Sequence, residues 1–386
     1  MTAEVPATGL ELRSMVADDA TVTVAVRETE VPEPLDEQVL VRVEAAPINP
    51  SDMGNLFARA DLTRAERVDG EHPAVRAPLD PGALRALRAR VGRAMPVGNE
   101  GAGTVIAAGR SERAQALVGT VVGFLSGTAY AQYRTLHIDQ CLPMHPGTTA
   151  EQAASAFVNP LTALGMVETM RAEGHTALVH TVGASNLGLM LNRICIADRI
   201  PLVNLVRRPE QAELLRGEGA EHIVDTSAEA FPESLVDALK ATGATLAFDA
   251  LGGGTLVDTL LRSMERALSD DAAQFSTYGS ATHKQVYTYG GLNTSPTVLK
   301  RDYGMAWGVG GWLLTPFLMN AGPETNDRLR QRVADEITTT FASAYGERLS
   351  LADVVDPAAI ARYSRIATGA KALVTPQRIV PGGSAD

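Results

Sequence analysis

Residues 177–208 constrain the fold of this 386-residue chain more than any other stretch. A short apolar run at 177–182 leads directly into a glycine-containing turn at 183–188. Apolar residues then recur at roughly helical spacing over 187–200, and a second apolar run follows at 202–206. Strand, tight turn, helix and strand within about 30 residues form a βαβ unit. The stretch therefore predicts an α/β domain with a parallel sheet.

The turn of this unit matches the dinucleotide-binding pattern G-x-G-x-x-G, with Ser185 in place of the middle glycine. In that pattern the helix N-terminus directs free N–H groups and a positive dipole end at the cofactor phosphates. A serine hydroxyl can donate to a phosphate oxygen, although its Cβ limits the approach of the backbone. We predict that the pyrophosphate of a dinucleotide binds at Gly183, Ala184, Ser185, Asn186, Leu187 and Gly188.

Helical and strand patterns alternate from about residue 150 onward, which predicts a doubly wound parallel sheet with helices on both faces. A strand at 245–248 is followed by a second glycine-rich loop that contains Leu251, and another strand is expected at 286–290. Ligands bind at the carboxyl ends of the strands in such sheets. A last helix is predicted at 326–342.

The N-terminal part of the chain has a different pattern. Residues 20–48 hold runs of alternating apolar and polar residues, and a glycine-punctuated run follows at 98–106, as expected of a β-rich lobe. Residues 130–133 are predicted as a further strand. Residues 59–94 are an elaboration rich in Arg and Ala, with a predicted helix at 81–93 that has proline at its start.

The composition excludes several classes of protein. A net charge of −11 argues against a nucleic-acid surface, and the chain holds no stretch of 18 apolar residues and no basic-then-apolar leader. The two cysteines, Cys141 and Cys195, are too few for a disulfide framework, and Cys195 lies on the apolar face of the 187–200 helix, where packing is expected. We expect a cytoplasmic protein with no membrane and no nucleic-acid partner.

The order of several short motifs resembles the medium-chain dehydrogenase/reductase superfamily, over nearly the whole chain except the 59–94 elaboration. The resemblance implies a GroES-like β-rich catalytic lobe at 1–155 and 325–386, interrupted by a Rossmann domain at 156–324. Besides the 183–188 turn, the motifs are Asn49 to Asp52, Gly98 to Gly103, Tyr130 to Tyr133, Pro160 to Ala163, Phe248 to Gly253 and Thr368 to Lys371.

The resemblance also bears on metal binding. Zinc-dependent members place ligands at positions that are Asn49 and Asn99 here, and a third near Val158 or Asn159. Amide oxygens are poor zinc ligands beside thiolate and imidazole. No metal is therefore expected, and the chain is similar to the zinc-independent quinone oxidoreductase-like branch. That branch transfers a hydride to a quinone or to an activated C=C.

Residue roles follow from the resemblance. Asn49 would lie near the nicotinamide and the substrate carbonyl, as the candidate catalytic residue. The expected cofactor-binding residues outside the 183–188 turn are Thr162, Leu251, Gly290, Gly291, Lys371 and the pair Arg207 and Arg208.

The arginine pair predicts which cofactor is used. NAD-preferring Rossmann domains place an acidic residue after the second strand, whereas here Arg207 and Arg208 follow it. Two guanidinium groups can pair with a 2′-phosphate, so NADPH is expected. The alternative is that both arginines lie at a solvated helix start.

We therefore predict an NADPH-dependent quinone or enone oxidoreductase with a small-molecule substrate. An enoyl-thioester reductase is the alternative, since those enzymes also have serine in the phosphate loop. They usually carry a tyrosine donor soon after the Asn-Pro motif, where this chain offers Phe57. A third possibility is an NADPH-binding interaction protein without turnover.

Three further expectations concern single residues and the assembly. Tyr278, Tyr289 and Tyr303 are candidate proton donors, and His180 is expected to be a buried core residue. Residues 307–314 combine tryptophans with glycines and are expected to form the contact of a homodimer, or else to line an apolar pocket.

Overall fold

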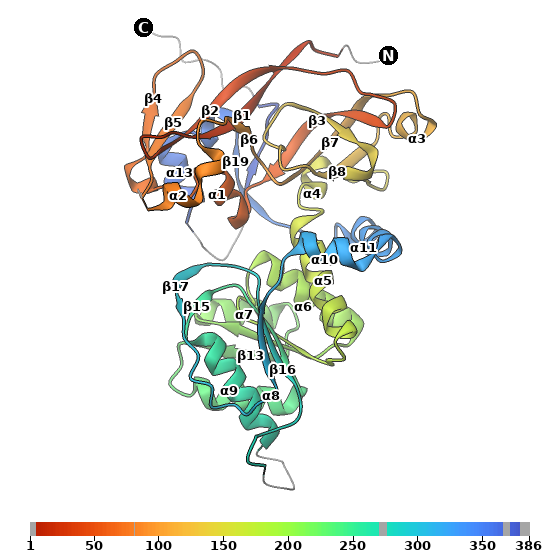
Figure 1. Cartoon of the computed structure of the whole chain (residues 1–386). Coiled ribbons are helices and arrows are strands. Elements are labelled where there is room, and N and C mark those ends of the chain that lie inside the picture. Colours follow the sequence, from red (N-terminus) through yellow and green to blue (C-terminus); the bar gives the residue numbers. More distant parts are fainter. Residues whose placement is uncertain (1–4, 81, 270–275, 366–370, 379–386) are drawn as a thin grey trace. The chain divides into compact units, whose positions relative to one another are not determined.

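The structure is a computed structural model that describes residues 5–80, 82–269, 276–365 and 371–378. The chain forms two compact units, shown in Figure 1. Unit 1 is Met1–Val158 with Arg330–Asp386, and unit 2 is Asn159–Leu329. The sequence placed these boundaries at 155/156 and 324/325.

Unit 1 contains two β-sheets with an apolar core that includes Leu12, Val41 and Phe124. One sheet has the order β4-β5-β2-β1-β6, and the other has the order β10-β8-β7-β3-β20-β19, with β9 also paired to β3. Its strands are β1 Thr8–Val16, β2 Thr21–Glu30, β3 Gln38–Pro47, β4 Glu66–Val68, β5 Ala74–Pro78, β6 Met95–Pro96, β7 Glu100–Ala108, β8 Val121–Leu125, β9 Tyr133–His137, β10 Cys141–Pro143, β19 Tyr345–Leu349 and β20 Lys371–Val374.

The helices of unit 1 are short. They are α1 Pro50–Phe57, η1 Leu62–Arg64, α2 Ala83–Ala86, η2 Arg88–Arg90, α3 Glu112–Gln115, η3 Ile138–Gln140, α4 Ala150–Ala153, α12 Leu351–Val354 and α13 Pro357–Tyr363. The chain passes between the units within α5 Val158–Ala172 and α11 Pro323–Glu336.

Unit 2 contains a parallel sheet with the strand order β13-β12-β11-β14-β16-β18. Numbered along the sheet's own chain order this is 3-2-1-4-5-6, the doubly wound arrangement of dinucleotide-binding domains. Its strands are β11 Leu178–His180, β12 Leu202–Val206, β13 His222–Asp225, β14 Leu246–Asp249, β16 Lys284–Thr288 and β18 Trp307–Gly311, and a small separate pair is β15 Gly252–Gly254 with β17 Asn293–Thr297.

Helices cover both faces of this sheet. Val203 and Leu205 pack with Leu235 and Leu260 on one face, where α8 Phe231–Thr242 and α9 Leu256–Ser269 lie. On the opposite face, the Asn204 side chain donates a hydrogen bond to α6 Asn186–Asp198. Val206 packs on the same face against α7 Pro209–Gly217. The sequence prediction of an α/β fold with a doubly wound parallel sheet and a β-rich lobe is confirmed. The remaining helix of unit 2 is α10 Leu314–Ala321.

Three of the predicted elements differ from the structure. The helix expected at 81–93 is two short pieces, α2 and η2, because the chain departs from helical geometry at Leu87 (φ −96°, ψ 6°). The strand expected at 130–133 begins only at Tyr133, since Tyr130 turns into the core and donates to the Pro47 carbonyl. The helix expected at 326–342 is α11, which ends at Glu336.

Candidate functional site

Asn49 and Lys371 are 322 residues apart in the sequence, and the structure brings them together. Strand β20 runs antiparallel to β3, with Val374 opposite Ala46 and Leu373 opposite Pro47. The same register, continued by two residues, places Lys371 opposite Asn49. The Lys371 ammonium donates to Asn49 Oδ1 at 2.6 Å. Two residues that the sequence assigned to different roles therefore form one polar contact.

Asn49 is also anchored on its other side. Strand β7 flanks β3 opposite to β20, and Glu100 at its start accepts from Asn49 Nδ2 at 2.8 Å. The second carboxylate oxygen of Glu100 accepts from the backbone N–H groups of Phe157 (2.9 Å) and Val158 (2.8 Å). Glu100 is fully buried. The amide of Asn49 is thus fixed in orientation by an acceptor and a donor.

Asp52 completes the group, which we call the Asn49 cluster: Asn49, Asp52, Glu100 and Lys371. Asn49 is the residue before α1, with Pro50 at the first helical position, which suits the fixed φ of proline. Asp52 accepts from the backbone N–H of Asn49 at 2.9 Å and from that of Asn99 at 2.8 Å. Asn49, Asp52 and Glu100 are buried, whereas Lys371 is partly exposed.

Burial dominates the electrostatics of the Asn49 cluster, since it disfavours charged forms. It raises the pKa of Asp52 to about 7, against the two N–H bonds that this carboxylate accepts. It also raises the pKa of Glu100 above its usual value. Burial lowers the pKa of the Lys371 ammonium to about 8, although Glu100 and Asp52 act in the opposite direction. Two groups with pKa values near neutral pH, Asp52 and Lys371, therefore lie close to Asn49, together with the buried Glu100 carboxyl.

In unit 2, the glycine-containing turn leads from β11 into α6 as the sequence predicted. Ser185 precedes the helix, and its Oγ accepts from the Gly188 N–H at 3.0 Å, so serine caps the helix. The Leu187 N–H has no acceptor among the described residues, so it can serve a ligand. A Cβ on Gly188 would lie 2.2 Å from the Gly183 carbonyl oxygen, so only glycine allows this tight packing.

The loops after β11 and β14 meet at the point where the strand order reverses. The Ala250 N–H donates to Thr181 Oγ1 at 3.0 Å, and Asp249 accepts from the N–H groups of Leu251 and Gly252 at 3.0 and 2.8 Å. Ligands of doubly wound sheets bind in the crevice at such a point. The predicted residue Leu251 therefore lies at the same sheet edge as the glycine-containing turn.

Gly290 and Gly291 follow β16, the next strand along, and approach the same loop. A Cβ on Gly290 would lie 2.5 Å from the Ala250 carbonyl oxygen, and the Leu251 carbonyl accepts from the Asn293 N–H at 2.9 Å. Thr162 is buried on α5. The structure thus joins Leu251, Gly290 and Gly291 at one edge.

Arg207 and Arg208 come directly after β12 and are both exposed. An acidic residue does lie nearby on the neighbouring strand, because Asp225 is opposite Val206. Asp225 Oδ1 is engaged by the Ser227 N–H and hydroxyl at 2.8 and 2.7 Å. Two exposed guanidinium groups therefore lie at the C-terminal end of β12.

The three candidate tyrosine donors occupy different environments. Tyr289 is half-buried and contacts His180, with 2.7 Å between its hydroxyl and His180 Nε2. Tyr303 is buried, and no hydrogen bond to its hydroxyl is found among the described residues. Tyr278 is 74% exposed. His180 is fully buried, as predicted, and desolvation lowers its pKa to about 3.

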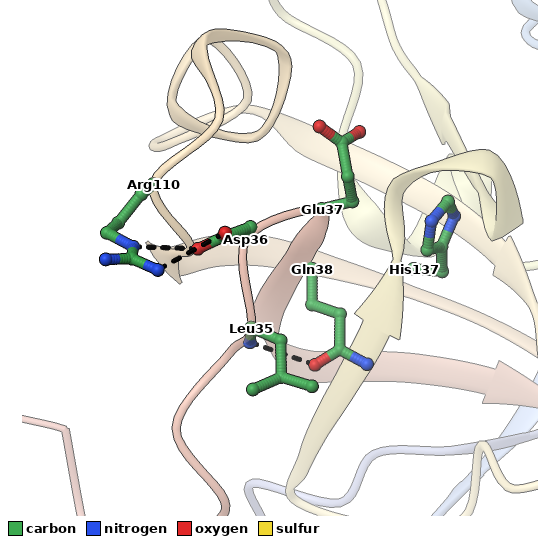
Figure 2. Close-up of a pocket in the computed structure, with 6 residues that line it drawn as sticks. All are labelled: Leu35, Asp36, Glu37, Gln38, Arg110 and His137. Carbon is green, nitrogen blue, oxygen red and sulfur yellow. Dashed lines mark hydrogen bonds and ion pairs between the residues drawn. The ribbon is translucent and has the colours of Figure 1, made fainter.

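An open pocket lies near the start of β3 (Figure 2). It is lined by Leu35, Asp36, Glu37, Gln38, Arg110 and His137. Asp36 is paired with Arg110 Nε at 2.8 Å, and Gln38 Oε1 accepts from the Leu35 N–H at 3.0 Å. None of these residues was expected at the site, so we assign no function to the pocket.

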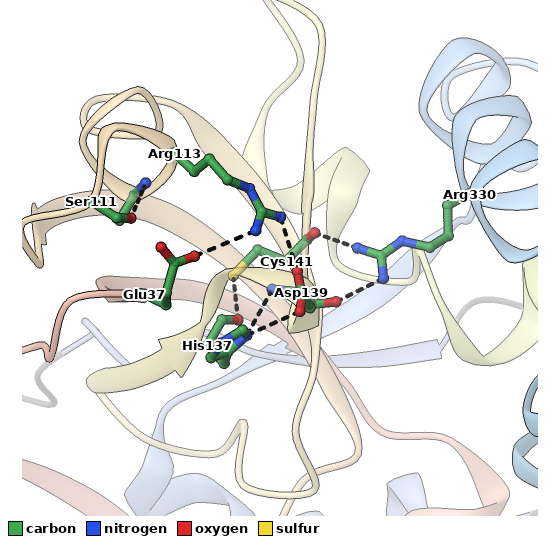
Figure 3. A network of polar contacts seen from close by, with 8 residues as sticks. Glu37, Ser111, Arg113, His137, Asp139, Cys141 and Arg330 are labelled. Carbon is green, nitrogen blue, oxygen red and sulfur yellow. Dashed lines mark hydrogen bonds and ion pairs between the residues drawn. The ribbon is translucent and has the colours of Figure 1, made fainter. Parts of the chain in front are cut away.

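A polar network in unit 1 has a structural role (Figure 3). Arg113 contacts Glu37 at 3.4 Å and Asp139 at 3.1 Å, and Arg330 donates to the carbonyl oxygens of Asp139 and Cys141. Burial raises the pKa of the Cys141 thiol to about 12, so it is not a nucleophile at neutral pH. Cys195 is likewise buried, as predicted.

No group of three or more His, Cys, Asp or Glu side chains in the described part of the chain could hold a metal ion. No helix within it has the length and apolar character needed to cross a membrane.

Solved structures share this architecture. A protein from Mesorhizobium loti named as an NADPH:quinone reductase is 23% identical, with a TM-score of 0.68 over 97% of this chain and 100% of its own. One from Bacillus thuringiensis with the same kind of name is 19% identical, with a TM-score of 0.69 over 95% and 99%. The ETR1p complex with NADP and crotonyl-CoA is 18% identical, with a TM-score of 0.64 over 95% and 99%. No family model matches the chain.

The chain therefore has the two-domain fold of these proteins, a GroES-like β-rich domain with a Rossmann domain. The fold that the resemblance implied, a GroES-like β-rich lobe with a Rossmann domain, is confirmed. Sequence reasoning missed the role of Asp52 and the contact between Lys371 and Asn49. The Thr368 to Ala370 part of the last motif lies outside the described residues.

Proposed function

We propose that this protein is an NADPH-dependent oxidoreductase that reduces a quinone or an enone. The observation that carries the proposal is the 3-2-1-4-5-6 sheet with its glycine-containing turn at the reversal point and two arginines after the second strand. The names of the similar solved structures support the same activity.

The residues of unit 2 fit the cofactor. The Leu187 N–H and the helix dipole would bind the pyrophosphate, and the Ser185 hydroxyl keeps a proton to donate because it accepts from Gly188. Arg207 and Arg208 would pair with the 2′-phosphate, and Thr162, Leu251, Gly290 and Gly291 would border the rest of the molecule. Bound there, NADPH supplies the hydride.

We propose that the reaction needs no zinc. Both polar atoms of the Asn49 amide are engaged, the oxygen by Lys371 and the nitrogen by Glu100. Asn99 is held by Asn55 (3.1 Å) and Ser51 (3.0 Å). A substrate that is already activated by a conjugated carbonyl does not require a Lewis acid.

The experiment that tests this proposal is steady-state NADPH oxidation against a panel of quinones, alkyl enones and enoyl-thioesters, repeated with NADH. The proposal predicts turnover of quinones or enones, with NADPH preferred. Thioester turnover well above quinone and enone turnover would favour the enoyl-thioester reductase alternative, which Ser185 and the likeness to the ETR1p complex support. Tight NADPH binding with no turnover would favour a binding protein.

We also propose that two copies pair through β18, the outer strand of the unit 2 sheet. Apolar side chains are exposed on and after it, with Val309 at 39%, Leu313 at 63% and Met319 at 78%. An open strand edge with apolar neighbours is a template for pairing. Light scattering should show a dimer that Leu313→Glu dissociates, and a monomeric wild type would contradict the proposal.

A further inference from the structure

The chain uses lysine very sparingly. It holds four lysines, at 240, 284, 300 and 371, against 30 arginines. Arginine keeps its proton under all physiological conditions, whereas an amine can release one when it is partly desolvated. A lysine at a buried polar cluster in so arginine-rich a chain therefore suggests that the position requires proton exchange.

The Lys371 ammonium has N–H donors available for a ligand. An ammonium has three N–H donors, and Lys371 gives one of them to Asn49 Oδ1 at 2.6 Å. No second acceptor for Nζ is found in the described part of the chain. The side chain is only partly buried, so the remaining donors can meet a small molecule.

We propose that Lys371 is the catalytic acid of the reaction, and that its ammonium binds the carbonyl oxygen of a conjugated ketone or quinone. Asn49 holds the ammonium in place, and Glu100 fixes Asn49 in turn. This inference rests on the proposed function and deepens it, because it names the group that would do what a metal ion does in other reductases.

The chemistry balances with the groups named. A hydride delivered to the β-carbon of an enone forms a C–H bond, breaks the C=C π bond and leaves its negative charge on the carbonyl oxygen as an enolate. Lys371 stabilises this oxygen and transfers one proton to it, which gives the enol and a neutral amine. The enol becomes the ketone by moving that proton to the α-carbon, and solvent returns a proton to the amine.

The surroundings of Lys371 support this role. Burial lowers its pKa to about 8, close to the operating pH that suits a general acid. The charged groups that face it are Glu100 on β7 and Asp52 on α1. On the neighbouring strand β19, Tyr345 is its register partner, but the Tyr345 hydroxyl donates to Ser155 at 2.8 Å.

The first test compares Lys371→Arg and Lys371→Met with Lys300→Arg, which changes an exposed lysine in unit 2. Lys371→Arg keeps the positive charge beside the two carboxylates but cannot release a proton at neutral pH. We expect kcat for enone reduction to fall about 100-fold in both Lys371 variants, with the Kd for NADPH within twofold of wild type. Lys300→Arg should match wild type.

The pH profile gives a second readout. The protonated amine is the active form, so kcat/KM of the wild type should fall as the pH rises through about 8. Lys371→Arg should lack this fall. A merely structural role for Lys371 would leave the fall in place, because another group would then cause it.

A third readout does not depend on turnover. Reductive ¹³C-methylation labels only the four lysines and the α-amino group, and Lys371→Arg identifies the signal of Lys371. We expect that signal to titrate near pH 8, and its midpoint to rise when the oxyanion 4-nitrophenolate is added with NADP⁺, because a nearby anion favours the ammonium.

Several results would overturn the inference. A kcat for enone reduction in Lys371→Arg within threefold of wild type would overturn it. A titration midpoint of the Lys371 signal that 4-nitrophenolate does not change would also overturn it. A Kd for NADPH raised tenfold or more would show instead that Lys371 binds the cofactor. A wild type that binds NADPH but reduces nothing in the panel would overturn the proposed function, and this inference with it.

Discussion

The buried His180 of unit 2 makes the free energy of unfolding depend on pH. Desolvation lowers the pKa of His180 to about 3, while the unfolded chain has a value near 6.5. Between these values the unfolded state binds a proton that the folded state does not. The free energy of unfolding therefore falls as the pH falls, by about 1.4 kcal/mol per pH unit well below 6.5. From pH 7 to pH 5 the loss from His180 is about 2 kcal/mol.

The test is the variant His180→Asn, which removes the titration. Both tryptophans of the chain, Trp307 and Trp312, lie in unit 2, so their fluorescence during urea unfolding reports on that unit. Wild type should lose about 2 kcal/mol more than His180→Asn between pH 7 and pH 5. Other titrating groups of unit 2 contribute equally to both proteins and cancel in the comparison.

A matched control is His283→Asn, which changes an exposed histidine of the same unit and should keep the pH dependence of wild type. The constant cost of removing the contact between His180 and Tyr289 does not affect the difference between the two pH values. Equal pH dependence in wild type and His180→Asn would refute the reasoning, since His180 would then be protonated in the folded state.

Three further predictions concern the cofactor site. Replacing Arg207 and Arg208 together with Ala should narrow the NADPH/NADH ratio of kcat/KM by about tenfold or more, since charge-assisted hydrogen bonds contribute roughly 1.5–3 kcal/mol; an unchanged ratio would exclude a phosphate contact. Gly188→Ala should destabilise unit 2 by about 1–3 kcal/mol in the same fluorescence assay, because its Cβ would meet the Gly183 carbonyl at 2.2 Å, whereas Gly217→Ala has open space and should not. Elemental analysis of protein purified without chelator should find no stoichiometric zinc, and one zinc per chain would contradict the proposed mechanism.

The sequence predicted the parts of the fold that depend on local pattern. The βαβ unit was recognisable because strand, glycine turn and helix follow one another directly. Gly188 is required by the close approach of the Gly183 backbone, and Gly183 by the Asn204 side chain. Local pattern was misleading at residues 81–93, where proline and alanine favour a helix. In the described part of this segment Leu84, Leu87 and Val91 pack inward, and the helix is interrupted at Leu87.

The Asn49 cluster could not be predicted in the same way. Lys371 reaches Asn49 because β20 pairs with β3, and that register connects segments at opposite ends of the chain. Glu100 arrives from a third strand, β7. The motif residues were visible in the sequence, but their contacts depend on strand order, which no single segment encodes. A rare lysine at the start of β20 was the available signal.

Deuterium transfer from NADPH tests directly whether this protein delivers a hydride to an activated C=C. The protein is incubated with NADPH that carries deuterium at the transferred position of C4, and with 4-phenyl-3-buten-2-one as the enone. We expect one NADP⁺ for each saturated ketone formed, with deuterium on the β-carbon of that ketone and none on the α-carbon. Consumption of NADPH without deuterium at the β-carbon, or recovery of both reactants unchanged while crotonyl-CoA is reduced, would contradict this expectation.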